Sequence, residues 1–320
     1  MRILVTGGLG FIGSNFIRYM LGKYRGISIV NLDKQTYAAC PENLRDVRSD
    51  NRYSYIKGDI CDKKTVLSAM RRCSAVINFA AETHVDRSIE DAALFLKTNV
   101  LGVHILLEAA RKLRVRRFIH IGTDEVYGSR LRGSFAEEDP LMPNSPYSAS
   151  KAAADMLVRS YIKTYGLPAM ITRSSNNFGP FQFPEKVIPL FITNLLEGKR
   201  APLYGDGRNV RDWIYVLDNC RGIDLVLQKG TIGEIYNIAA GNAMTNIKLT
   251  KLILKSLGKS ERRIQFVKDR PGHDRRYSLD IAKIRTLGFK PQFDFSKALA
   301  LTVHWYRQNQ TWWKKLKKRS

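Results

Sequence analysis

Short apolar runs alternate with amphipathic stretches over the first half of the chain. The runs are rich in Val and Ile and bounded by turn formers, the pattern of buried strands. They cover residues 2–5, 28–32, 53–57, 75–79, 117–122 and 169–173. Apolar positions recur at helical spacing between them, over residues 14–24, 63–71, 99–112 and 150–165. This βαβ alternation predicts an α/β fold, a Rossmann-type doubly wound parallel sheet with helices on both faces.

The pattern changes beyond Asn177. Residues 179–184 predict a loop and residues 187–197 a helix, while residues 211–227 and 234–239 are expected to return to the sheet. From residue 241 onward the pattern indicates mixed helix and short strand. We therefore predict two interleaved parts. The Rossmann domain comprises residues 1–178 plus about 209–240, and a smaller mixed α/β domain comprises about 179–208 plus 241–320.

Length and cysteine usage narrow the class of protein. A chain of 320 residues suits one large domain or two closely joined ones. The four cysteines have no metal-binding or disulfide spacing, which predicts reduced thiols, no metal site and a cytoplasmic location. The apolar start is broken at Thr6, which favours a first strand over a secretory leader. No uninterrupted apolar run approaches the ~20 residues that cross a bilayer.

The net charge of +24 is unusually high. Lys and Arg are scattered, with local clusters at residues 111–117 and 314–319. There is no zinc finger, no RNA-binding aromatic motif and no long basic tail. We expect solvated basic faces, with no nucleic-acid or membrane partner. Such a charge would speed the approach of a small anionic ligand such as a diphosphate.

A glycine-rich turn follows the first predicted strand. Gly7, Gly10 and Gly13 form GxxGxxG and open the first predicted helix. Glycines there permit a tight turn and a close approach of the backbone to a pyrophosphate at the helix N-terminus. The motif alone is weak, because a plain βα turn also uses glycine.

Asp33 strengthens the interpretation as a dinucleotide site. It ends the second predicted strand, twenty residues after Gly13, where a carboxylate bonds ribose hydroxyls and repels a 2′-phosphate. This favours NAD over NADP, although Lys34 next to it weakens the preference. Small or polar residues follow the third and fourth strands in register. The candidate cofactor residues are Gly7, Gly10, Phe11, Ile12, Gly13, Asp33, Lys34, Thr36, Asp59, Ile60, Phe79, Ala80 and Ala81.

Two further segments carry candidate catalytic groups. Tyr147 and Lys151 lie four apart on a predicted helix, so they share a face, and the ammonium can hold the phenol ionised as a base. Thr123, Asp124 and Glu125 follow a predicted strand, where such folds place their ligand crevice. Alcohol oxidation needs only the Tyr and the Lys. The added acid pair indicates a reaction that also moves a proton on carbon and expels a leaving group.

Six segments together resemble one known family. They keep their order, span nearly the whole chain, and cover residues 79–88, 123–128, 145–151, 175–180, 204–213 and 269–277. On these motifs the chain resembles the extended short-chain dehydrogenases/reductases, and within them the dTDP-glucose 4,6-dehydratases. A few positions depart from the family pattern, among them Leu9, Thr83, Phe178 and Phe181. No catalytic group is lost.

The resemblance implies a mechanism. Tyr147, assisted by Lys151 and Thr123, takes the proton of the sugar 4-hydroxyl while NAD⁺ accepts the C4 hydride. Glu125 then removes the C5 proton, which the 4-ketone acidifies, and Asp124 protonates the departing C6 hydroxyl. The hydride returns to C6 and NAD⁺ is regenerated, so the implied enzyme is a hydro-lyase of deoxysugar biosynthesis.

The resemblance also implies binding residues and an assembly. Thr98, Asn177, Tyr147 and Lys151 match further cofactor contacts. The implied substrate contacts are Thr83, Thr123, Asn176, Lys186, Val187, Pro202, Tyr204, Arg211, Asn246, Arg270, His273 and Tyr306. Amphipathic residues 100–110 and 152–161 favour a homodimer joined by a four-helix bundle, as in related enzymes.

Three alternatives stay open at this stage. A UDP-glucose 4,6-dehydratase would use the same residues, since thymine and uracil differ by one methyl. A UDP-sugar 4-epimerase or decarboxylase would share the fold, NAD and the Tyr–Lys pair, but would not need both acids. A catalytically idle Rossmann protein that binds polyanions through its positive charge would have no reason to keep the complete catalytic set.

Overall fold

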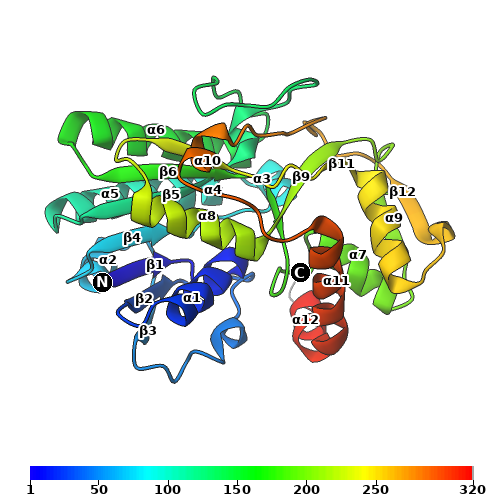
Figure 1. The fold of residues 1–320 in the computed structure, drawn as a ribbon, viewed down its shortest axis with the longest axis horizontal. Helices are drawn as coiled ribbons and strands as arrows, with labels where there is room; N and C mark the ends of the chain where they lie inside the picture. The colour runs from blue at the N-terminus through cyan, green and yellow to red at the C-terminus, as the bar shows by residue number, and fades with distance from the viewer. Residues whose placement is uncertain (319–320) are drawn as a thin grey trace.

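A seven-stranded sheet forms the centre of the larger part of the molecule (Figure 1). Its order is β10-β6-β5-β4-β1-β2-β3, and every neighbouring pair is parallel. The computed structural model describes residues 1–318, so the last two residues of the predicted smaller domain lie outside it. The strands are β1 (Arg2–Thr6), β2 (Ser28–Asp33), β3 (Tyr53–Lys57), β4 (Ala75–Asn78), β5 (Arg117–Thr123), β6 (Ala169–Ser174) and β10 (Ile235–Ile238).

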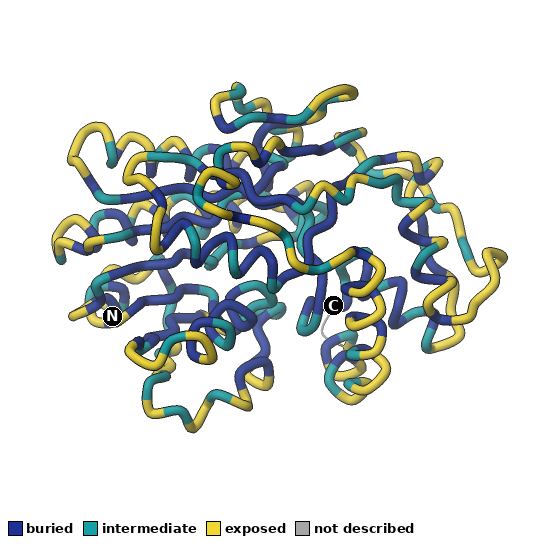
Figure 2. Tube along the Cα trace, viewed as in Figure 1, coloured by how far each residue is buried: buried dark blue, intermediate teal, exposed yellow. Residues whose placement is uncertain are grey.

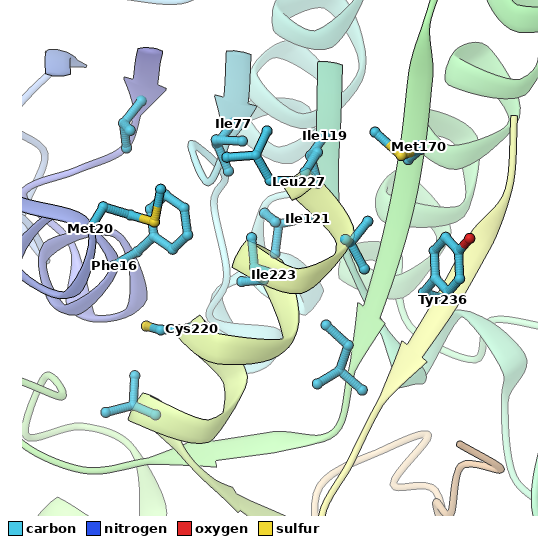
Figure 3. Close-up of a cluster of buried hydrophobic side chains, with 14 of the residues drawn as sticks. Phe16, Met20, Ile77, Ile119, Ile121, Met170, Cys220, Ile223, Leu227 and Tyr236 are labelled. Carbon is cyan, nitrogen blue, oxygen red and sulfur yellow. The ribbon is translucent and has the colours of Figure 1, made fainter. Parts of the chain in front are cut away.

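Helices cover both faces of this sheet. One face packs against α1 (Phe11–Lys23) and α8 (Val216–Lys229), and the other against α2 (Lys63–Met70), α5 (Gly102–Lys112) and α6 (Pro146–Tyr165). Figure 3 shows Phe16 and Met20 of α1 and Ile223 of α8 over Ile77 and Ile119 of the strands. The central strands β4 and β6 are buried throughout, whereas the edge strand β3 is partly exposed (Figure 2). The predicted doubly wound Rossmann-type fold is confirmed.

A second core lies beyond the carboxyl ends of the strands, on the right in Figure 1. It contains a three-stranded sheet of β11 (Ala243–Thr245), β9 (Val210–Tyr215) and β7 (Asn176–Phe178), and a parallel pair of β8 (Ala201–Tyr204) and β12 (Ile264–Val267). Its helices are α7 (Val187–Leu196), α9 (Asn246–Leu257), α11 (Phe295–Gln308) and α12 (Gln310–Lys317). The remaining elements are η1 (Pro41–Leu44), α3 (Val85–Glu90), α4 (Ala93–Phe95), the π-helical η2 (Leu96–Leu101), η3 (Asp124–Tyr127), η4 (Glu261–Arg263) and α10 (Ala282–Thr286).

The predicted return of residues 211–227 to the main sheet is wrong. β9 pairs with β7 and β11 instead, and the next residue begins α8, which packs against α1. Val216, Cys220 and Ile223 of α8 are buried at helical spacing. No Gly or Pro separates β9 from α8, so the two elements form one apolar stretch in the sequence. The expected return of residues 234–239 is confirmed, because β10 pairs with β6. The division into two domains stays a prediction.

Residues 93–112 form the helical stretch that bears on the expectation of no membrane-spanning segment. By length and composition, residues 93–112 are long and apolar enough to cross a bilayer, the one such stretch among the described residues. The stretch is not uninterrupted, since it contains Lys97 and Glu108, and close to half of it is buried inside the protein. A core helix passes the same test, and α5 packs here against α2 and α6.

Candidate active site

A cavity of about 330 Å³ follows the carboxyl ends of β1, β2, β4, β5 and β6. All of the predicted cofactor residues line it, as do Asp124, Glu125 and four predicted substrate residues, Thr83, Thr123, Asn176 and Lys186. The carboxyl ends of parallel strands meet at one edge, which is why segments so distant in sequence converge here. A second cavity, of about 650 Å³, lies beside α6 and residues 137–143 and contains none of the predicted site residues.

The glycine turn leaves no room for side chains. Gly7 has φ +70°, and a Cβ there would lie 2.7 Å from the nitrogen of Ala80. A Cβ on Gly13 would lie 2.5 Å from the carbonyl oxygen of Gly7. α1 begins just after the turn, so its first N–H groups and its positive dipole end face the cavity. This arrangement suits a pyrophosphate.

Asp33 is held rigidly at the end of β2. Its two carboxylate oxygens accept hydrogen bonds from the backbone N–H groups of Leu9 at 2.9 Å and Gln35 at 2.7 Å. Burial raises the pKa of Asp33, and these two N–H groups oppose the rise. Lys34 forms an ion pair with Asp59 at 2.8 Å, so its ammonium already has a carboxylate partner. The pair of residues therefore favours a free ribose diol over a 2′-phosphate.

Four residues that line this cavity each carry a buried polar atom with no partner among the described residues. They are Ser175 Oγ, Asn176 Oδ1, Asn177 Oδ1 and Gln182 Oε1. Buried polar atoms are nearly always hydrogen-bonded, so these four indicate a polar ligand. Together with the glycine turn and Asp33, they fit a dinucleotide lying along the sheet edge.

The acid pair lies in η3, immediately after β5. The Thr123 hydroxyl caps this turn, since it accepts from the N–H of Glu125 at 3.3 Å and donates to Asp124 Oδ1 at 3.2 Å. Asp124 is 2% exposed, and its Oδ2 has no partner among the described residues. Burial, and then the charge of Glu125, raise the pKa of Asp124 well above its usual range.

Glu125 lies in a different electrostatic environment. Burial raises the pKa of Glu125, but Arg270, Arg211 and Lys186 oppose the rise. A proton shared by the pair therefore favours Asp124, and Glu125 is the more readily ionised of the two. The arrangement accordingly suits one carboxylic acid and one carboxylate next to each other.

Tyr147 and Lys151 project from the first turns of α6. Pro146 and the capping box of Ser145 and Ser148 fix the start of this helix. Lys151 Nζ donates to the carbonyl oxygen of Ile121 at 2.7 Å, and burial lowers the pKa of Lys151 to about 8.

The expected ionised phenol is not what the protein alone produces. Burial raises the pKa of Tyr147, the Glu125 charge adds to the rise, and the Thr123 hydroxyl opposes it. Burial of the phenol is the larger effect and outweighs the Thr123 hydroxyl, while the Lys151 ammonium donates to the Ile121 carbonyl oxygen.

Three of the other predicted substrate residues, Tyr204, Arg270 and His273, gather near Asp86. Asp86 joins two of them, with Arg270 Nη1 at 3.6 Å and the Tyr204 hydroxyl at 3.4 Å. His273 lies against the Tyr204 ring, and Lys186 donates to the Thr83 carbonyl oxygen at 2.9 Å. β8, α3 and the segment after β12 thus meet in a basic and aromatic rim.

Four remaining substrate candidates lie further from the cavity. Arg211 on β9 is buried, stacks over the Tyr277 ring and donates to the Asp274 carbonyl oxygen. Val187 and Asn246 begin α7 and α9, and Pro202 lies on β8. The buried Asn246 Oδ1 lacks a partner among the described residues.

Tyr306 does not face the cavity. It is fully buried in the second core, and its hydroxyl donates to the Gln182 carbonyl oxygen. In this position it anchors the loop that carries Gln182, so the structure gives no support to its implied contact with substrate.

Three charged residues at the site were not predicted from the sequence. Glu82 and Glu185 line the cavity, and Glu185 accepts from the Tyr37 hydroxyl at 2.9 Å. Asp86 organises the rim. Asp86 lies inside segment 79–88 and could have been found there. Glu185 lies outside every motif, and only the fold brings it to the cavity.

The fold and the site define the class of protein. Three features define an NAD-dependent extended short-chain dehydrogenase/reductase. They are a doubly wound sheet with a glycine turn, an acidic residue at the end of β2, and a Tyr–Lys pair that lines the same cavity. Residues 4–302 match the family model described as GDP-mannose 4,6 dehydratase. The chain belongs to this family of nucleotide-sugar 4,6-dehydratases.

Relatives place the chain more narrowly. It is 51% identical to dTDP-glucose 4,6-dehydratase of Streptomyces niveus, over 99% of this chain and 96% of the relative. It is similar in structure to DesIV, a dTDP-glucose 4,6-dehydratase of Streptomyces venezuelae with NAD and TYD bound, with TM-score 0.97, 51% identity, and coverage of 99% and 100%. A UDP-glucose 4-epimerase of Thermus thermophilus in complex with NAD shares the fold at TM-score 0.88 but only 33% identity, with coverage of 97% and 100%.

Proposed function

We propose that this protein dehydrates dTDP-glucose to dTDP-4-keto-6-deoxyglucose, as an NAD-dependent hydro-lyase of deoxysugar biosynthesis. The observation that carries the proposal is the acid pair: Asp124, buried with a raised pKa, beside Glu125, which faces three cationic groups. One group is suited to give a proton and its neighbour to take one. About half of the residues are shared over full length with relatives named for this activity.

The chain's own residues account for the proton transfers. When bound, NAD accepts a hydride from sugar C4 and returns it to C6. The phenolate form of Tyr147 takes the proton of the 4-hydroxyl, and the hydrogen bond of the Thr123 hydroxyl favours that ionised form. Glu125 removes the proton at C5, and Asp124 gives its proton to the C6 hydroxyl, which leaves as water. Glu125 then returns a proton to C5.

Unequal acids matter because one group cannot remove and donate a proton at the same time. General acid–base assistance contributes roughly 10²–10⁴ to the rate per group. Asp124 must be neutral to act and Glu125 must be charged, and burial and the neighbouring cations favour this distribution. An epimerase has no departing hydroxyl and therefore no use for Asp124.

The rim supplies the charge that a nucleoside diphosphate needs. Lys186 lines the cavity, and the charges of Arg270 and Arg211 also act on Glu125. Arginine forks suit diphosphate oxygens. Thymine and uracil differ by one methyl, which is worth only ~0.8 kcal/mol when buried, so a nucleobase pocket discriminates weakly between them. UDP-glucose is therefore the second candidate substrate, by the same mechanism.

We also propose a cytoplasmic homodimer. α6 lies beside α5 and beside η2, which leads directly into α5. Two large apolar side chains here are well exposed, Leu101 at the end of η2 and Met156 on α6. Exposed apolar groups on adjacent helices favour a partner over water. A second copy of the same helices would bury them in a four-helix bundle.

The first test is mass spectrometry of purified protein with dTDP-glucose or UDP-glucose, without added NAD. Loss of one water from the dTDP sugar alone would support the proposal and show that NAD is carried and recycled. Preference for the UDP sugar would keep the mechanism and change the substrate. No mass change with either sugar, even after NAD is added, would overturn the dehydratase proposal and favour an epimerase or a non-catalytic protein.

A further inference from the structure

A row of buried polar side chains crosses the main sheet below the catalytic residues. Thr6, Asn78 and His120 are register neighbours on β1, β4 and β5, and none is more than 1% exposed. The Thr6 hydroxyl donates to Asn78 Oδ1 at 2.6 Å, and Asn78 Nδ2 lies 3.2 Å from His120 Nδ1. With its oxygen engaged by Thr6, the Asn78 amide presents its N–H₂ group to His120 Nδ1, which must then be the acceptor.

Next to His120 lies a buried ion pair. Asp155 is on α6, one helical turn beyond Lys151, and Arg173 is on β6. Asp155 Oδ2 accepts from Arg173 Nε at 2.8 Å, and both side chains are at most 1% exposed. Gly122 makes room for the pair, because a Cβ there would lie 3.2 Å from both Asp155 Oδ1 and Arg173 Cγ. The pair therefore packs against Gly122, the residue that precedes Thr123 on β5.

Two buried atoms of this cluster face each other without a hydrogen-bond partner among the described residues. They are His120 Nε2 and Asp155 Oδ1, and they lie 3.6 Å apart. Since His120 Nδ1 accepts from Asn78, the proton of the neutral ring is on Nε2 and points at the Asp155 oxygen. Burial, Lys151 and Arg173 all lower the pKa of His120, so its ring stays neutral.

We propose that Asp155 is a positioning residue for Lys151: its carboxylate, held by Arg173 and faced by the His120 N–H, keeps the neighbouring Lys151 ammonium charged and directed at the Ile121 carbonyl oxygen. The proposal rests on the proposed function, in which Lys151 assists Tyr147. It gives a role to His120, Asp155 and Arg173, three buried polar residues that do not line the candidate active-site cavity.

The electrostatic balance at Lys151 supports this assignment. Burial pulls the pKa of Lys151 down to about 8, and the charge of Asp155 opposes the fall. The other groups around the lysine do not supply a negative charge: His120 on β5 is neutral, Arg173 on β6 is cationic, and Tyr147 on α6 has a raised pKa. Without the Asp155 charge, Lys151 would lose its proton at lower pH.

The sign of the pH effect follows directly. If activity needs the charged Lys151, kcat/KM falls as the pH rises through about 8, the pKa of Lys151. Loss of the Asp155 charge lowers that pKa, so the decline on the alkaline side begins at lower pH. An opposite charge within a few ångströms commonly shifts a pKa by about 1–3 units.

The test is the double variant Asp155→Asn/Arg173→Met. Asp155→Asn alone would leave the buried Arg173 without its ion-pair partner, which is strongly destabilising. Removing both charges together avoids this cost. Asn also keeps an acceptor for His120. We expect the alkaline limb of kcat/KM for dTDP-glucose to move down by about one pH unit or more. NAD affinity, measured by tryptophan fluorescence, should weaken over the same lowered pH range.

Tyr127→Phe is the matched control. The Tyr127 hydroxyl accepts from Arg173 Nη1 at 2.8 Å on the far side of the ion pair, so its loss disturbs the same cluster without removing the Asp155 charge. We expect a lower melting temperature and an unchanged alkaline limb. A double variant that folds and keeps the wild-type pH profile and the wild-type pH dependence of NAD binding would overturn the proposal.

A measurement on the wild-type protein covers the case in which the double variant does not fold. ¹⁵N NMR of labelled histidine should show His120 neutral, with its proton on Nε2, down to acidic pH. A proton on Nδ1, or titration near the ordinary histidine pKa, would contradict the proposed contact with Asp155. Failure of the proposed function itself would appear separately, as absence of turnover with intact NAD binding, and would leave the NAD and NMR measurements interpretable.

Discussion

At the scale of single residues, two adjacent carboxyl groups are assigned different charges by their surroundings. Asp124 is buried, accepts from the Thr123 hydroxyl and feels the negative charge of Glu125, while Glu125 is influenced by two arginines and a lysine. The same residue pair on an open surface would titrate as two ordinary acids. The chemical roles of the two groups therefore come from burial and neighbouring charge.

This difference predicts different defects for isosteric variants. Asp124→Asn should lower kcat by roughly 10²–10⁴ but leave exchange at C5 intact, because Glu125 is still ionised. Glu125→Gln should abolish incorporation of solvent deuterium at C5. The measurement is NMR of the sugar after incubation in D₂O. Both variants should keep bound NAD, and normal C5 exchange in Glu125→Gln would contradict its assignment as the base.

Sequence motifs identified most residues of the site, but not the charged residues that surround and position them. Tyr147, Lys151 and the glycine turn could be predicted because fixed spacings carry their chemistry, and the cavity brings them together. Asp155 and Glu185 could not, because a lone carboxylate at either position is typical of a surface residue. Tyr306 was expected at the substrate, but aromatic residues fill cores as often as sites, and here the second core encloses it.

At the scale of elements, the turn between β1 and α1 predicts opposite outcomes for one kind of substitution. Gly13→Ala places a methyl 2.5 Å from the Gly7 carbonyl oxygen, and the turn must shift. We expect a loss of about 1–3 kcal/mol in stability and weaker NAD binding. Thermal unfolding and NAD titration measure both effects.

Gly22→Ala, on the same helix, is the control. A Cβ there meets nothing within 4 Å, and alanine in place of glycine in a helix gains roughly 0.5–1 kcal/mol. Its melting temperature should rise and its NAD affinity should stay unchanged. If Gly13→Ala behaved like Gly22→Ala, the turn would not be the tight cradle described here.

The limits of a strand or helix could be predicted where turn residues separate it from the next element. The strands buried on both faces of the parallel sheet form continuous apolar runs that end in turn residues. β9 and α8 meet at Tyr215 and Val216 with no such residue between them, so the change from strand to helix was not visible. The partners of β9 are β7 and β11, and no local pattern specifies pairing between such distant segments.

At the scale of the whole molecule, one edge of the sheet concentrates the chemistry and two neighbouring helices carry unpartnered apolar groups. The position of the cavity could be predicted because parallel strands always end together. The resemblance implied Tyr204 and Arg270 as rim residues, but their contacts with Asp86 on α3 could not be predicted, because they depend on how the second core packs.

The exposed apolar side chains on these neighbouring helices predict a homodimer. Leu101 is 48% exposed and Met156 is 41% exposed on packed helices, and a stable interface needs about 1,200–2,000 Å² in total. Sedimentation should give about twice the 36.5 kDa of one chain. The pair Leu101→Asp/Met156→Asp should shift the protein to monomer, because two buried carboxylates per copy would lose their hydration.

The control for that experiment is Leu131→Asp, at a loop residue that is 73% exposed and remote in sequence from both helices. It should leave the assembly unchanged, because an aspartate at this exposed position stays hydrated. Because α6 also carries Tyr147 and Lys151, separation of the subunits should lower activity more than Leu131→Asp does. A wild-type protein that sediments as a monomer at micromolar concentration would contradict the dimer and would leave Leu101 and Met156 without a partner to explain them.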